Sequence, residues 1–218
     1  MDDRLAELWP PFGLRVTCGP LLMRPLRDAD FPEVLAVVHG GIHAPDAMPF
    51  SFPWTDPTGA EQERQFVQYH WRARAELAPE RWQLDLGVWH EGRFVGIQGV
   101  STRDFPVTRT GETGSWLGRR FHGAGIGTLM RQAICVLCFD HLGFEEVTSG
   151  AFADNPASQA VSRKVGYRAN GEDRFARKGE ATTMLKLRLR PEELVRPPYD
   201  VETAGVEGFL ELVQARAT

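Results

Sequence analysis

Three glycines at the start of a predicted helix constrain this chain more than any other feature. Gly123, Gly125 and Gly127 lie where an apolar stripe of helical spacing begins, and the stripe continues over residues 126–142. Each glycine inside a helix costs about 0.5–1 kcal/mol relative to alanine, so three of them need a physical reason. One reason is an anion that binds the unpaired N–H groups of the first helical turn, where the helix dipole also favours negative charge. The other is close packing of the turn against a strand, and the glycines alone do not separate the two.

Two standard phosphate-binding loops do not match this stretch. It lacks the Gly-Lys-Ser/Thr ending of a P-loop. It also lacks a βαβ unit with an acidic residue at the distance that dinucleotide-binding folds require. If the glycines bind an anion, they do so in another kind of turn.

A second block, residues 153–167 (ADNPASQAVSRKVGY), follows the glycines after about thirty residues. Together, residues 114–128 and 153–167 resemble two motifs of the GNAT family of N-acetyltransferases. The first is similar to the family's Gln/Arg-x-x-Gly-x-Gly/Ala pyrophosphate motif. The second is similar to its Asn-x-x-Ser…Gly-Phe/Tyr motif, in the form found in the Rim-type (RimJ/RimL-like) branch of ribosomal-protein N-acetyltransferases. The resemblance covers roughly residues 21–189 and implies a bacterial-type enzyme that uses acetyl-CoA or another acyl-CoA.

The order of predicted elements favours one mixed α+β domain. Periodicity and turn residues predict the order β α α β β β α β α β β. We expect Pro25 to place the first strand at the edge of the sheet, and Asp28 to cap the helix after it. We expect an N-terminal arm over residues 1–20, an acyltransferase domain over 21–190, and a C-terminal extension over 191–218 packed on that domain.

The resemblance implies the GNAT fold, a mixed and mostly antiparallel central sheet with helices on both faces. It also implies that this sheet splays between its fourth and fifth strands, here residues 114–118 and 147–153, and that the pantetheine of the cofactor lies in the gap. His122 stands where the family has glutamine or arginine. The residues implied to bind the cofactor are Trp116, Leu117, Gly118, His122, Gly123, Ala124, Gly125, Gly127, Thr128, Asn155 and Ser158.

Acyl transfer to an amine needs a polarised thioester carbonyl and a stabilised leaving thiolate. The resemblance implies that the backbone N–H of Leu117 polarises the carbonyl, as an oxyanion hole does. The tyrosine that many family members use as an acid is replaced here by Ser162, which the resemblance therefore makes a candidate catalytic residue. In Rim-type members the serine at the position of Ser158 stabilises the thiolate. From the residues alone, Ser158 or Asn155 could equally be a helix cap.

The general base stays open among several groups. Asp104, Glu112 and Asp173 lie at predicted strand ends or loops, and a chain of water molecules is an alternative. An exposed carboxyl group with a pKa of about 4 is a poor base for an ammonium group, so burial would have to raise its pKa. His43 is a further candidate.

Residues 40–57 contain four prolines and two glycines, which excludes regular secondary structure. Their apolar side chains suit a plug at one end of the core, or the wall of a cleft for the acyl acceptor, or both. His43, Phe50 and Trp54 are therefore candidate substrate-binding residues. The loop is similar to a Pro-Phe…Pro-Trp loop of actinobacterial Rim-like transferases, one of them a mycobacterial N-succinyltransferase, so the resemblance also allows succinyl-CoA as the donor. A succinyl group would need a cation, for which the candidates are Arg103, Arg109 and Arg177.

Composition excludes several other classes of protein. A net charge of −4 over 218 residues argues against a broad nucleic-acid-binding face. No run of about 18 apolar residues exists, so we expect no membrane-spanning helix. Three cysteines and the absence of a signal-peptide pattern favour the cytoplasm. We interpret Cys135 and Cys138 as core residues, and expect no metal site.

Two functions of different classes fit these features. The first is an acyl-CoA-dependent N-acyltransferase that moves an acetyl or succinyl group to the amine of a protein N-terminus, a lysine or a small molecule. The alternative is a catalytically weak sensor module that only binds acyl-CoA, which the missing tyrosine favours. An open cleft beside residues 50–54 would favour the enzyme, and a plugged one the sensor. We expect a homo-oligomer in either case.

Overall fold

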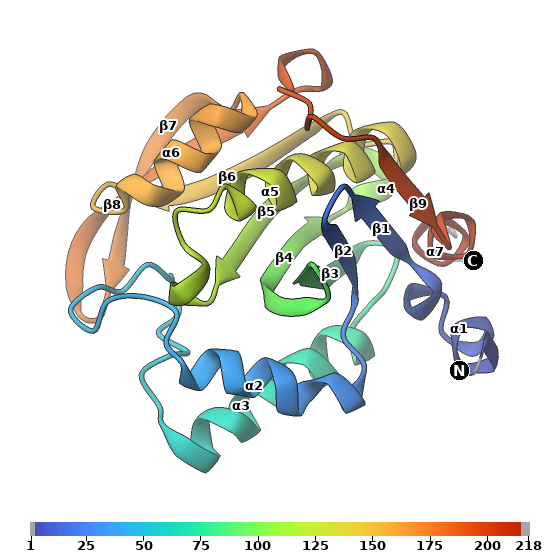
Figure 1. The fold of residues 1–218 in the computed structure, drawn as a ribbon. Helices are drawn as coiled ribbons and strands as arrows, with labels where there is room; N and C mark the ends of the chain where they lie inside the picture. Colours follow the sequence, from blue (N-terminus) through green and yellow to red (C-terminus); the bar gives the residue numbers. More distant parts are fainter. Residues whose placement is uncertain (1–2, 215–218) are drawn as a thin grey trace.

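The computed structural model describes residues 3–214, which form one nine-stranded sheet flanked by helices (Figure 1). The strands are β1 (Arg15–Cys18), β2 (Leu21–Pro25), β3 (Arg81–His90), β4 (Arg93–Arg103), β5 (Thr110–Leu117), β6 (Glu146–Phe152), β7 (Arg168–Arg177), β8 (Glu180–Leu189) and β9 (Val201–Ala204). The α-helices are α1 (Asp3–Leu8), α2 (Phe31–His39), α3 (Gly59–Ala75), α4 (Phe105–Thr108), α5 (Ile126–Val136), α6 (Pro156–Val165) and α7 (Val206–Gln214). The strand order in the sheet is β7-β8-β6-β5-β4-β3-β2-β1-β9.

The sheet is splayed in the middle. All neighbouring strands are antiparallel except β5 and β6, which run parallel. This pair is joined only over residues 110–112 and 146–148. Beyond that point β5 continues to Leu117 and β6 to Phe152 without pairing with each other. The sheet therefore opens into a V, and the GNAT fold expected from the resemblance is confirmed.

Helices cover both faces of the sheet, with α5 and α6 on one side and α2 and α3 on the other (Figure 1). On the α5 side, Met130 and Ile134 belong to one buried apolar cluster that also contains Trp82 of β3 and Phe209 of α7. On the other side, Phe31 of α2 and Phe66 of α3 belong to a second cluster. Between these layers the middle of β4 is buried on both faces, which suits a central strand.

The two ends of the described chain meet and extend the sheet, which corrects the expected position of Pro25. The expected arm over residues 1–20 contains β1, and the expected extension over 191–218 contains β9 and α7. Strand β9 pairs with β1, which pairs with β2, so Pro25 ends an inner strand. Pro25 is the last residue of β2, so the N–H that it lacks is missing only at the end of the strand. Phe209 of α7 is fully buried, which ties the tail to the core.

The prediction that Asp28 caps α2 is wrong, because the N-cap of α2 is Asp30, which makes no side-chain cap hydrogen bond. A short 3₁₀ turn at Asp28–Asp30 precedes it, and the carboxylate of Asp30 accepts the backbone N–H of Arg27 at 2.6 Å. The Asp28 carboxylate instead accepts hydrogen bonds from Arg74 and Trp71 of α3. Asp28 therefore joins two helices rather than capping one. The absence of regular structure predicted for residues 40–57 is confirmed.

Candidate active site

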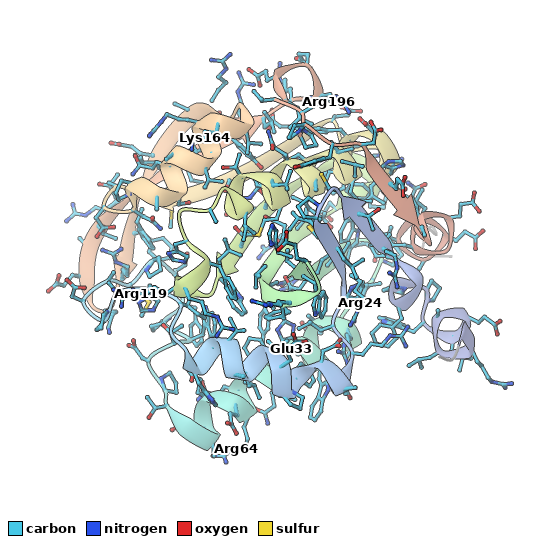
Figure 2. All side chains as sticks on the ribbon, in the orientation of Figure 1. Arg24, Glu33, Arg64, Arg119, Lys164 and Arg196 are labelled. Carbon is cyan, nitrogen blue, oxygen red and sulfur yellow. The ribbon has the colours of Figure 1, made fainter. Side chains whose placement is uncertain are left out.

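The V between β5 and β6 opens into a cleft of about 1060 Å³. Its walls come from separate parts of the chain, namely the open ends of β5 and β6, the starts of α5 and α6, residues 42–51, and the tip of the β7–β8 hairpin. Two cations of its lining, Arg119 before α5 and Lys164 on α6, are labelled in Figure 2. The predicted site residues that line the cleft are His43, Phe50, Trp116, Leu117, His122, Gly123, Gly125, Gly127, Thr128, Asn155 and Ser158.

The glycine turn owes its glycines to backbone conformation and open space. Gly123 and Gly125 both have φ of +81°, in the left-handed region that glycine favours. A Cβ at either position would meet no atom within 4 Å, so close packing does not explain them. At Gly127, a Cβ would only touch side-chain atoms at 3.5 and 3.6 Å. The turn is therefore open to the cleft, directly before the N-terminus of α5, where N–H groups and the helix dipole favour an anion.

The edge of β5 that faces the gap is free to bind a ligand. The N–H of Gly118 donates to the carbonyl of Val95 on β4 at 2.9 Å. Backbone groups alternate in direction along a strand, so the N–H and C=O of Leu117 point away from β4, into the V. His122 Nε2 lies 3.1 Å from the Leu117 carbonyl oxygen. Since a carbonyl only accepts, the imidazole donates from Nε2.

Helix α6 begins at the cleft with a side-chain cap. The side-chain oxygen of Asn155 accepts a hydrogen bond from the backbone N–H of Ser158 at 3.1 Å. Asn155, and not Ser158, is therefore the N-cap of α6. Among the described residues, the Ser158 hydroxyl has no hydrogen-bond partner. It lines the cleft, where it is available to a ligand. The helix ends at Gly166, whose φ of +109° is that of a C-cap glycine.

The loop over residues 40–57 both lines the cleft and supports it from behind. His43 and Phe50 face the cleft, and the His43 ring bonds the Thr55 hydroxyl at 2.8 Å. Trp54 does not line the cleft. Its ring lies 5.7 Å from that of Trp116 and 5.8 Å from that of Phe66, which fixes the loop on the second cluster. Part of the loop therefore packs on the core and part of it lines the cleft, and the role of His43 and Phe50 toward an acceptor stays a prediction.

Two predicted catalytic residues lie outside the cleft. The Ser162 side chain is 1% exposed and points into the core, and its hydroxyl finds no partner among the described residues. Asp104 precedes α4 at the opposite end of β4 from the open V, because β4 and β5 are antiparallel. Neither is part of the cleft lining. The predicted cofactor residues Gly118 and Ala124 also lie outside the lining.

Among the acidic residues considered as a base, Glu112 lines the cleft, and Asp173 does not. Side chains alternate along β5, so Glu112, Gly114 and Trp116 share one face. The ring of Trp116 lies 6.4 Å from that of Phe66, which places this face on the α2 and α3 side of the sheet. Glu112 therefore stands on the opposite side of β5 from α5 and the glycine turn.

Of the three candidate cations, only Arg177 lines the cleft. Its guanidinium donates to the Met48 carbonyl at 2.9 Å and to the Asp154 carboxylate at 3.0 Å. The hydrogen bond from Arg177 holds the pKa of Asp154 below its usual value. Lys178 also pairs with Asp56 at 2.7 Å, so the β7–β8 hairpin contacts the loop over residues 40–57 at two points. Arg177 thus already has a counter-charge of its own.

Sequence reasoning missed Arg131, a cation buried in the cleft wall. It lies on α5, where residues 130–136 are all buried. A helical stripe assigns Arg131 and Gln132 to the solvent face. In the structure, Gln132 instead donates to the Val195 carbonyl of the C-terminal segment at 2.8 Å, so that segment covers α5. The signal in the sequence was two polar residues inside an otherwise apolar run.

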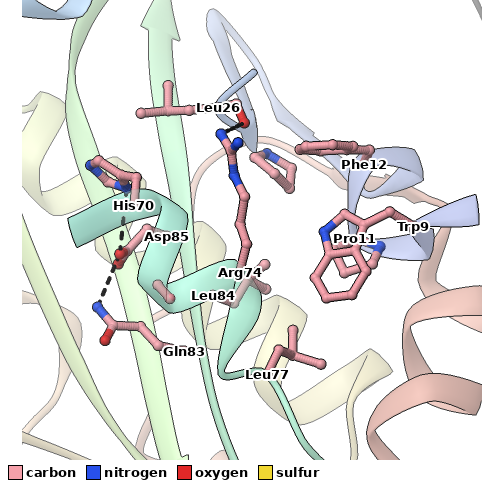
Figure 3. A pocket seen from close by; sticks show the side chains of 12 residues that line it. Trp9, Pro11, Phe12, Leu26, His70, Arg74, Leu77, Gln83, Leu84 and Asp85 are labelled. Atoms are coloured by element: carbon pink, nitrogen blue, oxygen red, sulfur yellow. Dashed lines mark hydrogen bonds and ion pairs between the residues drawn. The ribbon is translucent and has the colours of Figure 1, made fainter. Parts of the chain in front are cut away.

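A second hollow, of about 40 Å³, lies outside the cleft between the N-terminal segment, α3 and β3 (Figure 3). His70 and Asp85 face each other at its edge, with 3.9 Å between Nδ1 and the carboxylate. His70 Nε2 is buried without a partner among the described residues. Burial lowers the pKa of His70, against the opposing effect of Asp85. The hollow is too small for a substrate and serves packing.

Among residues 3–214, no helix is both long and apolar enough to span a bilayer. The same residues contain no group of three or more His, Cys, Asp or Glu side chains able to hold a metal ion.

Comparison with known proteins identifies the family. The acetyltransferase (GNAT) domain family matches residues 20–168, which is more than half of the chain. This chain belongs to the GNAT acetyltransferase family. A Bacillus subtilis protein of the family, YdaF, named as a candidate ribosomal N-acetyltransferase, is 27% identical over 120 residues. That alignment covers 55% of this chain and 63% of YdaF, less than two thirds of the relative.

Solved structures share the fold at low sequence identity. Mycobacterium smegmatis RimJ, in complex with a CoA disulfide, superimposes with a TM-score of 0.66 and 21% identity, over 91% of this chain and 93% of RimJ. RimL, named a ribosomal L7/L12 α-N-protein acetyltransferase and also solved with coenzyme A, gives 0.63 and 18%, over 78% and 94%. In this GNAT chain, as the fold requires, the glycine turn, the open edge of β5 and the start of α6 border a single gap.

Proposed function

We propose that this GNAT protein is an acyl-CoA-dependent N-acyltransferase. It moves an acetyl or succinyl group from a CoA thioester to the amine of a protein N-terminus, a lysine or a small molecule, by direct attack of the amine. One observation carries the proposal: the unpaired edge of β5, with the N–H of Leu117 directed into the gap, leads to the open turn at Gly123 and Gly125.

The cofactor side of the reaction uses mainly backbone groups. The pyrophosphate binds the N–H groups of the glycine turn and the start of α5, with Thr128 beside them. The pantetheine lies along β5 and bonds its open edge at Leu117, whose N–H then polarises the thioester carbonyl. Asn155 caps α6 and orients its first turn, so that the free Ser158 hydroxyl can donate to the departing thiolate.

The acceptor side lies across β5. Glu112 lines the cleft there and is exposed in the free chain, so it takes the proton of the attacking ammonium group through water once the bound acceptor covers it. Phe50 and His43 form the opposite wall. The acceptor in RimL's name favours a protein N-terminus as the acceptor here, and an open cleft of about 1060 Å³ favours turnover over a sensor. The homo-oligomer and the cytoplasmic location expected from the sequence stay predictions.

The test is an acyl-transfer assay with acetyl-CoA and succinyl-CoA as donors. Acceptors are a panel of peptides with different N-terminal residues, peptides with an internal lysine, and small amines, and the release of free CoA thiol is followed. We expect release that depends on both protein and amine. The matched control is each peptide with its amine blocked by acetylation. Binding of CoA esters without transfer to any acceptor would contradict the proposal and favour the sensor.

A further inference from the structure

A formally charged side chain is buried in the wall of the cleft. Among residues 4–214, Arg131 is the only buried Lys, Arg, Asp or Glu, at 4% exposure. Three of the other buried polar residues, Gln98, Thr113 and Ser149, surround it. A guanidinium with this many buried polar neighbours is held in a built site rather than left in the core by chance.

The partners of Arg131 are all neutral. Its Nε donates to the Gln98 side-chain oxygen at 3.2 Å. Its Nη1 donates to the hydroxyls of Ser149 at 3.1 Å and Thr113 at 3.4 Å. Its Nη2 donates to the Ser115 hydroxyl at 2.8 Å. These four bonds leave one of the five N–H groups without a partner in the described chain, at Nη2.

No carboxylate of the described residues offsets this charge. None of the ion pairs among residues 3–214 includes Arg131. Burial of a cation is unfavourable unless it is paired with an opposite charge. Arg131 lines the cleft together with Ser115 and Ser149, so a ligand in the cleft can supply the missing negative charge.

The position of Arg131 along β5 tells which part of a ligand it meets. The glycine turn follows the open end of β5 at Leu117, whereas Arg131 contacts Ser115 and Thr113, closer to the vertex of the V. A donor with its phosphates at the glycine turn and its thioester carbonyl at Leu117 extends its acyl chain toward that vertex. The phosphates are thus too far along the strand, and the anion at Arg131 belongs to the acyl group.

We propose that Arg131 binds a free carboxylate at the far end of the acyl group, so that the preferred donor is a CoA thioester of a short dicarboxylic acid, such as succinyl-CoA. The inference rests on the function proposed above and adds the donor class and the residue that selects it. A guanidinium suits this role because its planar N–H groups match a carboxylate. It also differs from the sequence-based candidates Arg103, Arg109 and Arg177.

The carboxylate takes no part in the bond changes. The amine nitrogen attacks the thioester carbonyl carbon, so that a C–N bond forms and the C–S bond breaks. CoA leaves as a thiolate, and the proton lost by the amine balances it. Arg131 holds the far end of the chain throughout and therefore acts on specificity rather than on the reacting atoms.

Binding of three ligands to the full chain tests this without knowledge of the acceptor. Calorimetric titration compares CoA, butyryl-CoA and succinyl-CoA, because butyryl has the four carbons of succinyl but lacks the carboxylate. We expect wild type to bind succinyl-CoA about tenfold or more tightly than butyryl-CoA, the effect of hydrogen bonds to a charged group. Arg131→Met should lose this preference and keep the affinity for CoA, and Arg131→Lys should keep part of the preference.

Several outcomes would overturn the inference. If wild type binds succinyl-CoA no more tightly than butyryl-CoA, the inference is wrong. This comparison uses wild type alone, so it holds even if Arg131→Met fails to fold. The inference is also wrong if Arg131→Met lowers the affinity for all three ligands equally, because Arg131 would then only support the cleft. Ser115→Ala, which removes one partner of Nη2 and leaves the charge in place, should change the preference less than Arg131→Met does. Failure of CoA itself to bind wild type would instead refute the proposed function.

Discussion

The two faces of β5 present different groups to the same cleft. Toward α5, Thr113 and Ser115 bond the buried guanidinium of Arg131. Toward α2 and α3, Glu112 and Trp116 face a part of the cleft bordered by aromatic rings, which is the proposed acceptor side. Because successive side chains of a strand point to opposite faces, one strand can position the acyl donor on one face and the amine acceptor on the other.

This difference separates binding from chemistry. The proposed cofactor side relies mainly on backbone N–H groups, which truncation of a side chain leaves in place, so changes in the conformation of the turn should weaken CoA binding most. The acceptor side relies on single side chains, so substitutions there should lower the rate and leave CoA affinity unchanged. Variants on each side of β5 therefore test whether CoA binding and catalytic rate depend on separate faces of the strand.

Glu112→Gln is the sharpest test of the acceptor face. Loss of a general base should lower kcat about 100-fold, while the Kd for CoA stays that of wild type. Steady-state kinetics and calorimetry measure the two. Asp104→Asn is the matched control and should behave as wild type, because Asp104 lies outside the cleft. A Glu112→Gln protein with full kcat would assign proton removal to another group.

Gly125→Ala tests the cofactor face. A left-handed conformation costs about 1–2 kcal/mol for a residue with a Cβ, and the new methyl group points into open cleft space. We expect CoA affinity to fall about tenfold or more. Gly171→Ala carries matched backbone strain, with φ of +96° and open space around it, outside the cleft lining. It should lose stability and keep CoA affinity, and equal losses of CoA affinity in both variants would refute the assignment.

His122→Ala separates side chain from backbone on the cofactor face. The imidazole makes one hydrogen bond to the Leu117 carbonyl, worth about 0.5–1.5 kcal/mol. CoA affinity should therefore change by less than about tenfold, well below the effect of Gly125→Ala. Calorimetric titration gives both values. A larger loss for His122→Ala would mean that the phosphate grip depends on this side chain.

His70 gives a pH effect on stability outside the cleft. Burial lowers its pKa in the folded state, so the unfolded chain binds more protons once the pH falls below about 6.5. The free energy of unfolding should therefore decrease as the pH falls through that value. His70→Leu should show a smaller drop in Tm between about pH 7.5 and pH 5.5 than wild type. His122→Ala, which removes an exposed histidine, should keep the wild-type drop.

The position of the proposed cofactor residues at the cleft could be predicted from sequence because these residues are close together in the chain. The glycines, His122 and the start of α5 lie within a few residues, and Asn155 and Ser158 lie within one helical turn. Local chemistry also explains the Asn155 and Gly166 caps of α6 and the irregular loop at residues 40–57. The splay came from the resemblance, and the register of β5 and β6 confirms it.

The remaining features depend on contacts between distant segments. Pro25 looked like an edge residue because nothing in the sequence announces that β9 pairs with β1 and places β2 inside the sheet. Arg131 escaped notice because its partners Gln98, Ser115 and Ser149 come from three different strands, which only the folded sheet brings together. Ser162 was misplaced because one helix position decides whether a side chain meets the cleft or the core.

A crystal structure of the protein with CoA would show directly how the cofactor lies in the V. We predict the pyrophosphate on the N–H groups of Gly123 and Gly125, and the pantetheine along the open edge of β5, bonded at Leu117. We also predict the sulfur on the Leu117 side of Ser115, with the Arg131 guanidinium beyond it. CoA bound at another place would contradict this arrangement. So would a crystal structure without CoA in which the gap between β5 and β6 is closed.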